Sequence, residues 1–518
     1  MHILNNASRR LFLRQAGAMS ALVGAGAPMA LNMAAIGTAA AQSGSDYKAI
    51  VCLFLFGGND GYNMVLPTDS ASWAAYTATR NQAPDPISLL VPGIAANPEA
   101  AAGSPARLGG VLPLSVANPQ GRSFALHPLM SSVQSLFNVD RRVAILPNIG
   151  PLVRPTSKAD YANSGFPKPL RLFSHNDQQN TWQALAPEGS TRGWGGRIAD
   201  QLQSLNGRPI FSAISAAGNS VWLSGEQVVQ YQVTTSGAVP LGVDPGGRVF
   251  GSATAGATLQ RLASTARGSH PFEFDTAAVA GRSIAAELAL RTALRPAGDT
   301  AFGSAPASGT YVQSNDPKLR YTNPLTGAVA YNGLAGQLQM VARLVDAGLS
   351  GATGARRQVF FVSMGGFDTH DLQNRNQADL MARLDHALKY FDTTLGALNA
   401  RDQVTTFTAS DFGRTFTSNG DGTDHGWGSH HLVMGGAVRG GDIYGSFPTL
   451  ALKNSNNSGF DGSPQQLSNG ALLPGTSVDQ LGYTLGSWFG VSPAQLGEIF
   501  PNLSNFNASV RNLGFMTA

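Results

Sequence analysis

The sequence has a single cysteine, few charged residues and, beyond residue 41, no long apolar run. Because Cys52 has no partner cysteine, the fold contains no internal disulfide, and this residue is expected to be a small core side chain. Charged residues make up 13% of the chain, about half of the usual share, which predicts a polar surface of low charge. No segment after residue 41 has 18 consecutive apolar residues, so we expect no stable membrane span in the mature form.

The first 41 residues have the three parts of a secretory signal. Arg9 and Arg10 are adjacent, a stretch rich in alanine and glycine covers 16–35, and three alanines precede Gln42. The paired arginines indicate the twin-arginine route, in which the translocase exports a folded protein. We therefore expect a mature chain that starts near residue 42 and is periplasmic or secreted. The alternatives are an uncut anchor or an N-terminal helix of the mature fold.

The mature chain is close to electrical neutrality. Removal of residues 1–41 takes away three arginines and no acidic residue, which leaves basic and acidic side chains almost balanced. No basic stripe is present, so nucleic acid is excluded as a partner.

Four short, continuous apolar runs are typical of buried parallel strands. They cover 49–56, 143–146, 359–363 and 404–408. Leucines recur at helical spacing in 377–398, between the last two runs, which indicates a strand–helix–strand unit. Further helices are expected over 332–347, 478–490 and 493–500. We predict an α/β fold with a largely parallel central sheet and helices on both faces, as one domain over 42–518 with loop-rich insertions near 65–120 and 215–320.

Acidic and imidazole side chains follow the predicted strands. Asp60 follows the first run, Asp368 and His370 follow the third, and Asp411 follows the fourth, with His425 soon after. Four of the nine histidines are expected in glycine-rich loops between 370 and 431. Carboxylates and neutral imidazoles at strand ends suit a divalent metal such as Zn²⁺, Mn²⁺ or Ca²⁺. The alternative is that the aspartates cap loops and the histidines are hydrogen-bonded structural groups.

Several motifs together resemble a known bacterial family. They are Gly-Gly-Asn-Asp-Gly at 57–61, Gly-Gly-Phe-Asp-Thr-His at 365–370, Ser-Asp-Phe-Gly-Arg-Thr at 410–415 and Gly-Thr-Asp-His-Gly-Trp-Gly at 422–428. With Phe-Ser-His at 173–175, they resemble the twin-arginine-exported family catalogued as domain of unknown function 1501, over about 48–502. That family is similar to a distant branch of the alkaline phosphatase and sulfatase superfamily.

The resemblance implies a set of site residues. It implies metal ligands at Asp60, Asp368, His370, Asp411 and His425. It also suggests Ser174, at an expected helix start, as the nucleophile, activated by the metal. Arg414 is a candidate for holding an oxyanion, because a guanidinium forms paired hydrogen bonds with phosphate or sulfate; the alternative is a structural salt bridge.

The sequence departs from the superfamily pattern at three points. Only Thr369 separates Asp368 from His370, where three residues usually intervene. Phe412 stands where an imidazole ligand is usual, and no Cys-x-Pro-x-Arg motif for sulfatase formylglycine is present. The sequence therefore leaves three alternatives for the site: one metal ion, a different metal, or no metal. The candidates for substitute ligands are His175, His430 and His431.

Two functions follow from these observations. One is an exported metal-dependent hydrolase of phosphate or sulfate esters, acting on a small molecule or a glycan. The other is a non-catalytic exported protein on the same fold, for surface assembly or carbohydrate binding.

Overall fold

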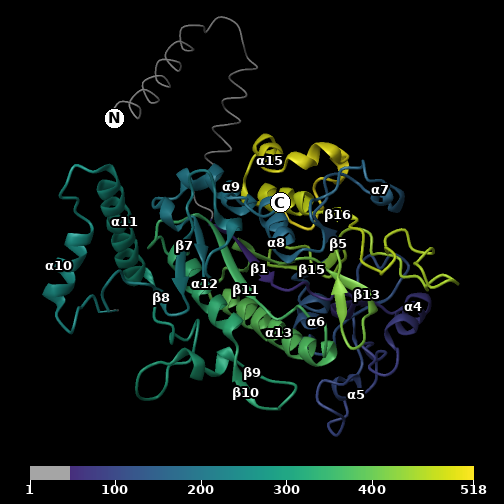
Figure 1. The fold of residues 1–518 in the computed structure, drawn as a ribbon. Helices are drawn as coiled ribbons and strands as arrows, with labels where there is room; N and C mark the ends of the chain where they lie inside the picture. Colours follow the sequence, from purple (N-terminus) through teal and green to yellow (C-terminus); the bar gives the residue numbers. More distant parts are fainter. Residues whose placement is uncertain (1–46, 245, 518) are drawn as a thin grey trace, which may run out of the picture. The chain divides into compact units, whose positions relative to one another are not determined.

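The computed structural model describes residues 47–244 and 246–517. A nine-stranded sheet runs through this part of the chain in the order β16-β5-β15-β12-β1-β11-β6-β7-β8 (Figure 1). From one edge to the other the strands are β16 (Thr476–Ser477), β5 (Val143–Gly150), β15 (Ser429–Met434), β12 (Val404–Ser410), β1 (Lys48–Leu55), β11 (Arg357–Met364), β6 (Ala213–Ser215), β7 (Tyr231–Thr234) and β8 (Gly237–Ala238). The proposed signal, residues 1–41, lies outside the described residues.

The middle of the sheet is parallel. β1 lies between β11 and β12 and pairs with both in parallel, with Lys48 opposite Arg357 and Ala49 opposite Val404. β11, β6 and β7 continue the parallel arrangement, whereas β15 is antiparallel to both β12 and β5. The largely parallel central sheet is therefore confirmed.

Apolar side chains are buried on both faces of β1. Val51, Leu53 and Leu55 pack into one core, while Ile50 and Phe54 pack into the other. This explains the continuous apolar run in the sequence, because successive side chains of a strand point to opposite faces. Cys52 belongs to the second core, is buried and is unpaired, as expected.

Helices cover both faces of the sheet, as predicted. One face carries α6 (Ser131–Asn138), α12 (Gly333–Leu349) and α13 (Gln373–Ala397), whose apolar residues join the first core. The other carries α8 (His175–Ala184), α9 (Trp194–Leu202), α14 (Val478–Phe489) and α15 (Pro493–Ile499). α13 begins four residues before the predicted start, directly after Leu372, whose φ of 46° is left-handed.

The segments expected to be insertions contain small elements. Residues 61–126 form α3 (Gly61–Met64), β2 (Val65–Pro67), α4 (Ser70–Arg80), α5 (Pro105–Leu108), β3 (Leu112–Pro113) and β4 (Phe124–Leu126). After β8, the chain forms α10 (Ala253–Ala263) and α11 (Pro271–Ala293), which extend beyond that edge of the sheet (Figure 1). α7 (Lys158–Ala162) and a hairpin of β9 (Arg320–Thr322) and β10 (Val329–Tyr331) complete the smaller elements.

One sequence expectation about loops was wrong. The segment after β12 forms a hairpin of β13 (Arg414–Ser418) and β14 (Thr423–His425), followed directly by β15. His425 therefore lies on a strand, and His430 and His431 lie inside the buried sheet. The many glycines of this segment made these short strands look like loops in the sequence. In the structure each strand pairs with at least one other strand. No helix among the described residues is long and apolar enough to cross a membrane.

Candidate metal centre

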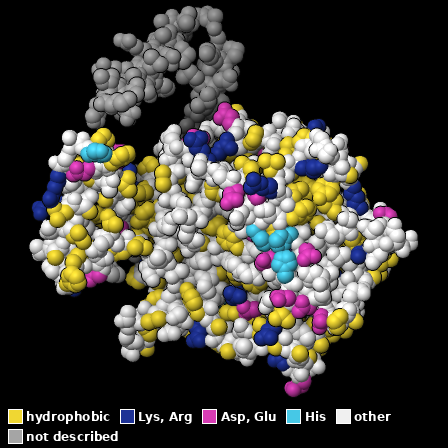
Figure 2. Space-filling model, viewed as in Figure 1, with side chains coloured by type: hydrophobic (Ala, Val, Ile, Leu, Met, Phe, Trp, Pro, Cys, Tyr) yellow, Lys and Arg dark blue, Asp and Glu magenta, His cyan; other side chains and the backbone are white. Residues whose placement is uncertain are grey.

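The candidate site lies where three neighbouring parallel strands end. β1 is followed by Gly57, β11 by the turn that carries Asp368 and His370, and β12 by Asp411. Because these strands are parallel and adjacent, their carboxyl ends meet at one edge of the sheet, which is where α/β folds place their ligands. Figure 2 shows histidine side chains gathered on this surface with acidic side chains beside them.

A glycine is required where β1 approaches the Asp368 turn. Gly57 has φ +116°, and a Cβ built on it would lie 2.3 Å from the backbone nitrogen of Asp368. No side chain fits at that distance, and the left-handed φ adds strain for any other residue. Gly57 thereby allows the loop after β1 to contact the turn that carries Asp368, and this contact positions Asp368 at the end of the sheet.

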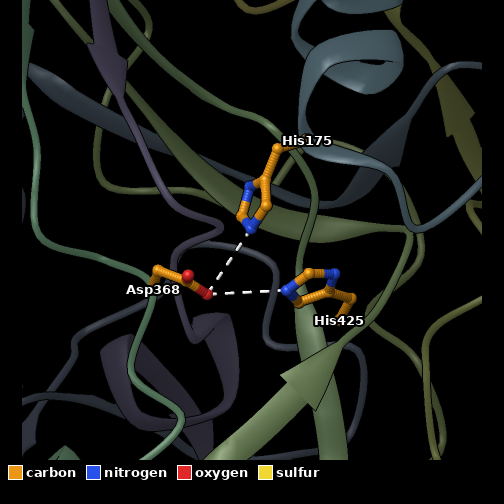
Figure 3. A group of neighbouring side chains, drawn as sticks. All are labelled: His175, Asp368 and His425. Carbon is orange, nitrogen blue, oxygen red and sulfur yellow. Dashed lines mark ion pairs between the residues drawn. The ribbon is translucent and has the colours of Figure 1, made fainter.

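Three histidines surround one carboxylate oxygen. His370 Nε2 lies 3.1 Å from Asp368 Oδ1, and His175 Nε2 and His425 Nε2 each lie 3.5 Å from the same oxygen. The Nε2 atoms of His370 and His425 are 3.0 Å apart. Figure 3 shows His175 and His425 pointing at Asp368 from two sides. Ligand atoms of His175, Asp368 and His425 all lie within 4.8 Å of one another.

Each of these histidines is held through its other ring nitrogen. His175 Nδ1 lies 2.7 Å from Asp411 Oδ2, and His425 Nδ1 lies 2.8 Å from the carbonyl oxygen of Phe173. His370 Nδ1 lies 3.4 Å from Asp424 Oδ1. An acceptor on Nδ1 favours the tautomer whose Nε2 has a free lone pair, which is the arrangement of metal-binding histidines.

Asp411 is buried and orients His175. Its Oδ2 also accepts a 2.8 Å hydrogen bond from Gln179 Nε2, and its Oδ1 accepts one of 3.2 Å from the Gly57 backbone N–H. The side chain is fully buried. The structure thus places Asp411 behind His175, where it touches the imidazole and is not among the converging ligand atoms.

The environment sets the protonation of the site. The hydrogen bond to Asp411, and then its charge, raise the pKa of His175 above the ordinary value despite partial burial. Burial is the main reason that the pKa of His425 is lowered. Burial alone would raise the pKa of Asp368, but the hydrogen bond and charge of Arg414 outweigh it and lower that pKa. At neutral pH, Asp368 is therefore an anion and His425 a neutral donor of a lone pair.

Arg414 connects the loops that form the site. Its guanidinium is buried and donates to the carbonyl oxygens of Gly57, Gly58 and Thr423, and it forms a short contact with Asp368. Backbone carbonyls thus occupy most of the donors that the sequence analysis assigned to an oxyanion.

Phe412 packs against the two most buried histidines of the group. Its ring centroid lies 4.6 Å from that of His425 and 4.8 Å from that of His175. The residue that departs from the superfamily pattern is therefore an apolar wall that excludes water from one side of the site.

Asp60 lies in a different cluster. Its carboxylate forms a buried ion pair with Arg80, 2.6 Å from Oδ2 to Nη1, and contacts Gln373 Nε2. Its Oδ1 accepts from the Tyr62 backbone N–H, as the N-cap of α3. The structure brings Asp368, His370 and His425 together, but it gives the predicted ligand Asp60 an arginine and an amide as partners.

Ser174 and the substitute ligands are placed as follows. Ser174 is the N-cap of α8, the expected helix start, but its hydroxyl donates to Asp177 Oδ2 at 2.8 Å. His430 and His431, buried in β15, do not belong to the converging group, whereas His175 does. The Phe-Ser-His motif at 173–175 was the sequence signal for this region. There the nucleophile was assigned to Ser174, and His175 was named only as a substitute ligand.

Comparison with known proteins adds a family but no reaction. A family model described as "Protein of unknown function (DUF1501)" matches residues 47–500. No curated protein sequence matches the chain. Among solved structures, "Crystal structure of Ps i-CgsB" shares 10% identity with a TM-score of 0.32, covering 89% of this chain and 77% of that one.

A second solved structure has a similarly weak likeness. Its title is "Metabolism of multiple glycosaminoglycans by bacteroides thetaiotaomicron is orchestrated by a versatile core genetic locus", with 10% identity and a TM-score of 0.34. It covers 88% of this chain and 74% of that one. At TM-scores this low, neither likeness identifies a fold or a reaction.

Proposed function

The chain belongs to the DUF1501 family of proteins of unknown function, and we propose that it is an exported, metal-dependent hydrolase of phosphate or sulfate esters. Export rests on the twin-arginine pattern of residues 1–41. The hydrolase assignment rests on the geometry of the candidate metal centre.

One observation carries the metal assignment. His175, His370 and His425 each present Nε2 to Asp368 while an acceptor holds Nδ1. Ordinary structural histidines have no reason to converge in this way, because their lone pairs and a carboxylate repel one another unless a proton or a cation lies between them. The paired Nδ1 contacts are the second set of interactions that metal-binding histidines usually have.

The distances suit a small divalent cation. Zinc with nitrogen and oxygen ligands at about 2.0–2.1 Å in a tetrahedron needs its ligand atoms about 3.3 Å apart. The separations among Asp368 Oδ1, His370 Nε2 and His425 Nε2 are 3.0, 3.1 and 3.5 Å. His370 and Asp368 are partly exposed, with side-chain exposures of 43% and 47%, so a substrate can reach the centre.

The residues around the centre divide the work of hydrolysis. A bound divalent cation supplies polarisation of the ester oxygen and activates an attacking group. Asp368 and the three histidines would hold that cation, and Arg414 fixes the Asp368 turn against the end of β1. Phe412 keeps water from the inner side of the imidazoles. Asp411 holds the His175 ring in one orientation.

Metal analysis of the purified mature protein tests the proposal. After divalent metals are added and excess is removed, we expect about one metal ion per chain, with loss in Asp368→Ala and His425→Ala. Asp275→Ala is the matched control, because Asp275 is an exposed aspartate on α11, which follows the edge strand β8. The same preparations are then tested on phosphate and sulfate monoesters of an aryl alcohol. A wild type that takes up no metal, or metal content unchanged in both site variants, would contradict the proposal.

A specific observation favours a second function, a non-catalytic exported protein for surface assembly or carbohydrate binding. Two of the predicted ligands, Asp60 and Asp368, already contact the guanidinium groups of Arg80 and Arg414. An arginine in such a place balances the charge of the carboxylate, as a metal ion would, but it does not activate an attacking group. This function predicts a folded, metal-free protein that binds oligosaccharides but turns over neither ester.

A further inference from the structure

The α10–α11 arm (residues 253–293) extends beyond one edge of the central sheet (Figure 1) and has almost no core of its own. Gly256 is the only buried residue of α10, so no side chain of that helix is buried. α11 has 23 residues and buries four of them, Ala277, Ala286, Glu287 and Leu290. Helices in proteins gain most of their stability from packing an apolar face. This arm therefore lacks a sufficient packing partner within the part of the chain that the structure describes.

Large apolar side chains lie on the surface of the arm. Figure 2 shows hydrophobic side chains across this part of the molecule. Six large apolar residues of the arm are between 40% and 75% exposed: Leu259, Leu262, Phe272, Phe274, Val279 and Leu288. A single exposed apolar residue is ordinary. A group of this size on two helices that contact each other is typical of a surface that another molecule covers.

Part of this surface is a stripe that runs along α11. Its residues follow one another at intervals of four and three: Phe274, Ala278, Gly281, Ala285 and Leu288. This spacing is the repeat of helices that pair along a common seam. Both alanines are exposed, and Phe274 and Leu288 are 53% and 52% exposed. Only Gly281 is partly covered, by Ser264 at the end of α10. The stripe is therefore open to a second helix over most of its length.

The order of sizes within the stripe favours an antiparallel partner with the same sequence. When two copies of α11 run antiparallel, Phe274 of each copy lies opposite Ala285 of the other. A large side chain then meets a small one, so the two helices interlock. In a parallel pair, Phe274 meets Phe274 at the same level, and the small residues leave a gap beside them. Residue sizes along α11 therefore match a second copy of the same helix in the antiparallel direction.

The charges beside the stripe suit the same arrangement. Asp275 and Arg282 are exposed and lie seven residues apart, so they are on the same side of the stripe. Neither side chain forms an ion pair or a hydrogen bond with another described residue. In the register that sets Phe274 opposite Ala285, Asp275 of each copy lies within one helical turn of Arg282 of the other. Because the contact is symmetric, two complementary ion pairs form.

A membrane surface fits the arm less well than a second copy does. Helices that lie on membranes have lysine or arginine beside their apolar anchors. Here Phe272 and Phe274 alternate in the sequence with Glu273 and Asp275, and anionic lipid headgroups would repel these carboxylates. The arm has four arginines, no lysine and three acidic residues. This near balance of charge suits self-association, because two copies do not repel one another.

We propose that two copies of the mature chain form a symmetric dimer through this arm, with α11 of one copy antiparallel to α11 of the other. The contact buries Phe274 and Leu288 and pairs Asp275 of each copy with Arg282 of the other. Such an interface uses the same surface on both copies, so it closes at two chains and forms no filament. The metal centre takes no part in it, and metal content per chain is independent of the dimer.

Analytical ultracentrifugation of the mature protein tests the inference. We expect the mass of two chains at micromolar concentration, with or without added divalent metal. Phe274→Lys and Leu288→Arg should each raise the dissociation constant of the dimer by about 10-fold or more, because each places a charge in the buried seam. Val139→Arg is the matched control, because Val139 is 76% exposed but lies outside the arm, directly after α6. This control should remain as dimeric as the wild type.

Reversal of the two charges tests the register. Asp275→Arg places arginines together at both contacts of the dimer, and Arg282→Asp places carboxylates together, so each variant alone should be monomeric where the wild type is dimeric. An equal mixture of the two variants restores an arginine and an aspartate at each contact. The mixture should therefore form a dimer with one copy of each variant. Circular dichroism spectra equal to that of the wild type show that the variants are folded.

Three results would overturn the inference. The first is a wild type that stays monomeric at its highest soluble concentration. The second is a dimer that withstands both seam variants, or a mixture of folded charge variants that stays monomeric. The third comes from flotation with vesicles of phosphatidylglycerol and phosphatidylethanolamine: wild-type protein that is monomeric and floats with them, while Phe274→Lys does not, would assign the arm to a lipid surface.

Discussion

The Nδ1 atom of His175 lies 2.7 Å from Oδ2 of Asp411, and this contact joins the first residue of α8 to the end of β12. The two residues are 236 positions apart in the sequence. A carboxylate in this position acts on a site through the imidazole that it orients, which separates its role from that of a ligand.

Asp411→Asn should therefore retain the metal and lose activity. The amide keeps the shape of the side chain but removes the charge behind His175, so we expect kcat to fall by about 10–100-fold, the usual effect of losing such a partner. Metal content per chain and steady-state kinetics on an aryl phosphate give the two readouts. Loss of the metal would instead show that Asp411 is a ligand, as the sequence resemblance implies.

Gly57→Ala should displace the Asp368 turn. The added methyl carbon would lie 2.3 Å from the Asp368 nitrogen, at a φ that disfavours side chains, so the turn or the end of β1 has to move. We expect metal affinity to fall by at least 10-fold, measured by competition with a chelating dye. Gly365→Ala is the matched control, because a Cβ at that position meets nothing within 4 Å; equal affinities in both variants would contradict the prediction.

Asp60→Asn should destabilise the protein without removing the metal. Arg80 and Asp60 form a buried pair, and loss of one partner leaves the other charge uncompensated, at a cost of about 3–5 kcal/mol. Denaturant unfolding should show this loss, and Asp60→Asn combined with Arg80→Met should recover part of it. Metal content equal to that of the wild type separates Asp60 from the ligands, whereas a metal-free Asp60→Asn would restore it to that set.

Stability should fall as the pH falls below about 6.5 because of buried histidines. Burial lowers the pKa of His127, His430 and His431 to about 3 each. A histidine whose pKa is lower in the folded state contributes stability above its unfolded pKa of about 6.5, and this stability is lost as the pH falls toward the folded pKa, because the unfolded chain binds the proton first.

The variant His127→Asn tests the contribution of one of these histidines. His127 Nδ1 accepts from the Leu129 backbone N–H, and Asn at this position keeps an acceptor without a titrating group. Between pH 4 and 5.5, we expect the free energy of unfolding of His127→Asn to change less steeply with pH, by about 1.4 kcal/mol per pH unit. Denaturant titrations at several pH values measure the slope, and parallel slopes would mean that His127 is already protonated in the folded protein.

The sequence predicted those parts of the fold in which local pattern and burial agree. The runs at 49–56 and 404–408 became β1 and β12 because strands buried on both faces are continuously apolar. α13 was found from its leucines, yet its start was four residues off, because a left-handed Leu372 and contacts to Asp421 set that boundary. β15 was missed because His430 and His431 read as loop residues, and only their burial between two strands shows otherwise.

The candidate site was predicted in part for a related reason. Asp368, His370 and His425 follow strand ends or lie on a hairpin packed against them, so their positions after the predicted strands, together with the family resemblance, pointed to them. Asp60 also follows a strand, but Arg80, on α4, takes its carboxylate. That contact depends on how a helix 20 residues later folds back, and no local pattern in the sequence encodes it. His175, the first residue of α8, was predicted only as a substitute ligand, because its place beside Asp368 depends on the tertiary fold.

The position of β1 at the centre of the sheet also affects how the chain is made. Its two neighbours, β11 and β12, begin at Arg357 and Val404. More than 300 further residues must therefore be synthesised after β1 before either of its edges can form backbone hydrogen bonds with a neighbouring strand. Pairing over such a separation is slow, and it leaves an apolar segment available to wrong partners in the meantime. We therefore expect this polypeptide to depend on a chaperone that shields its beginning until translation is nearly finished.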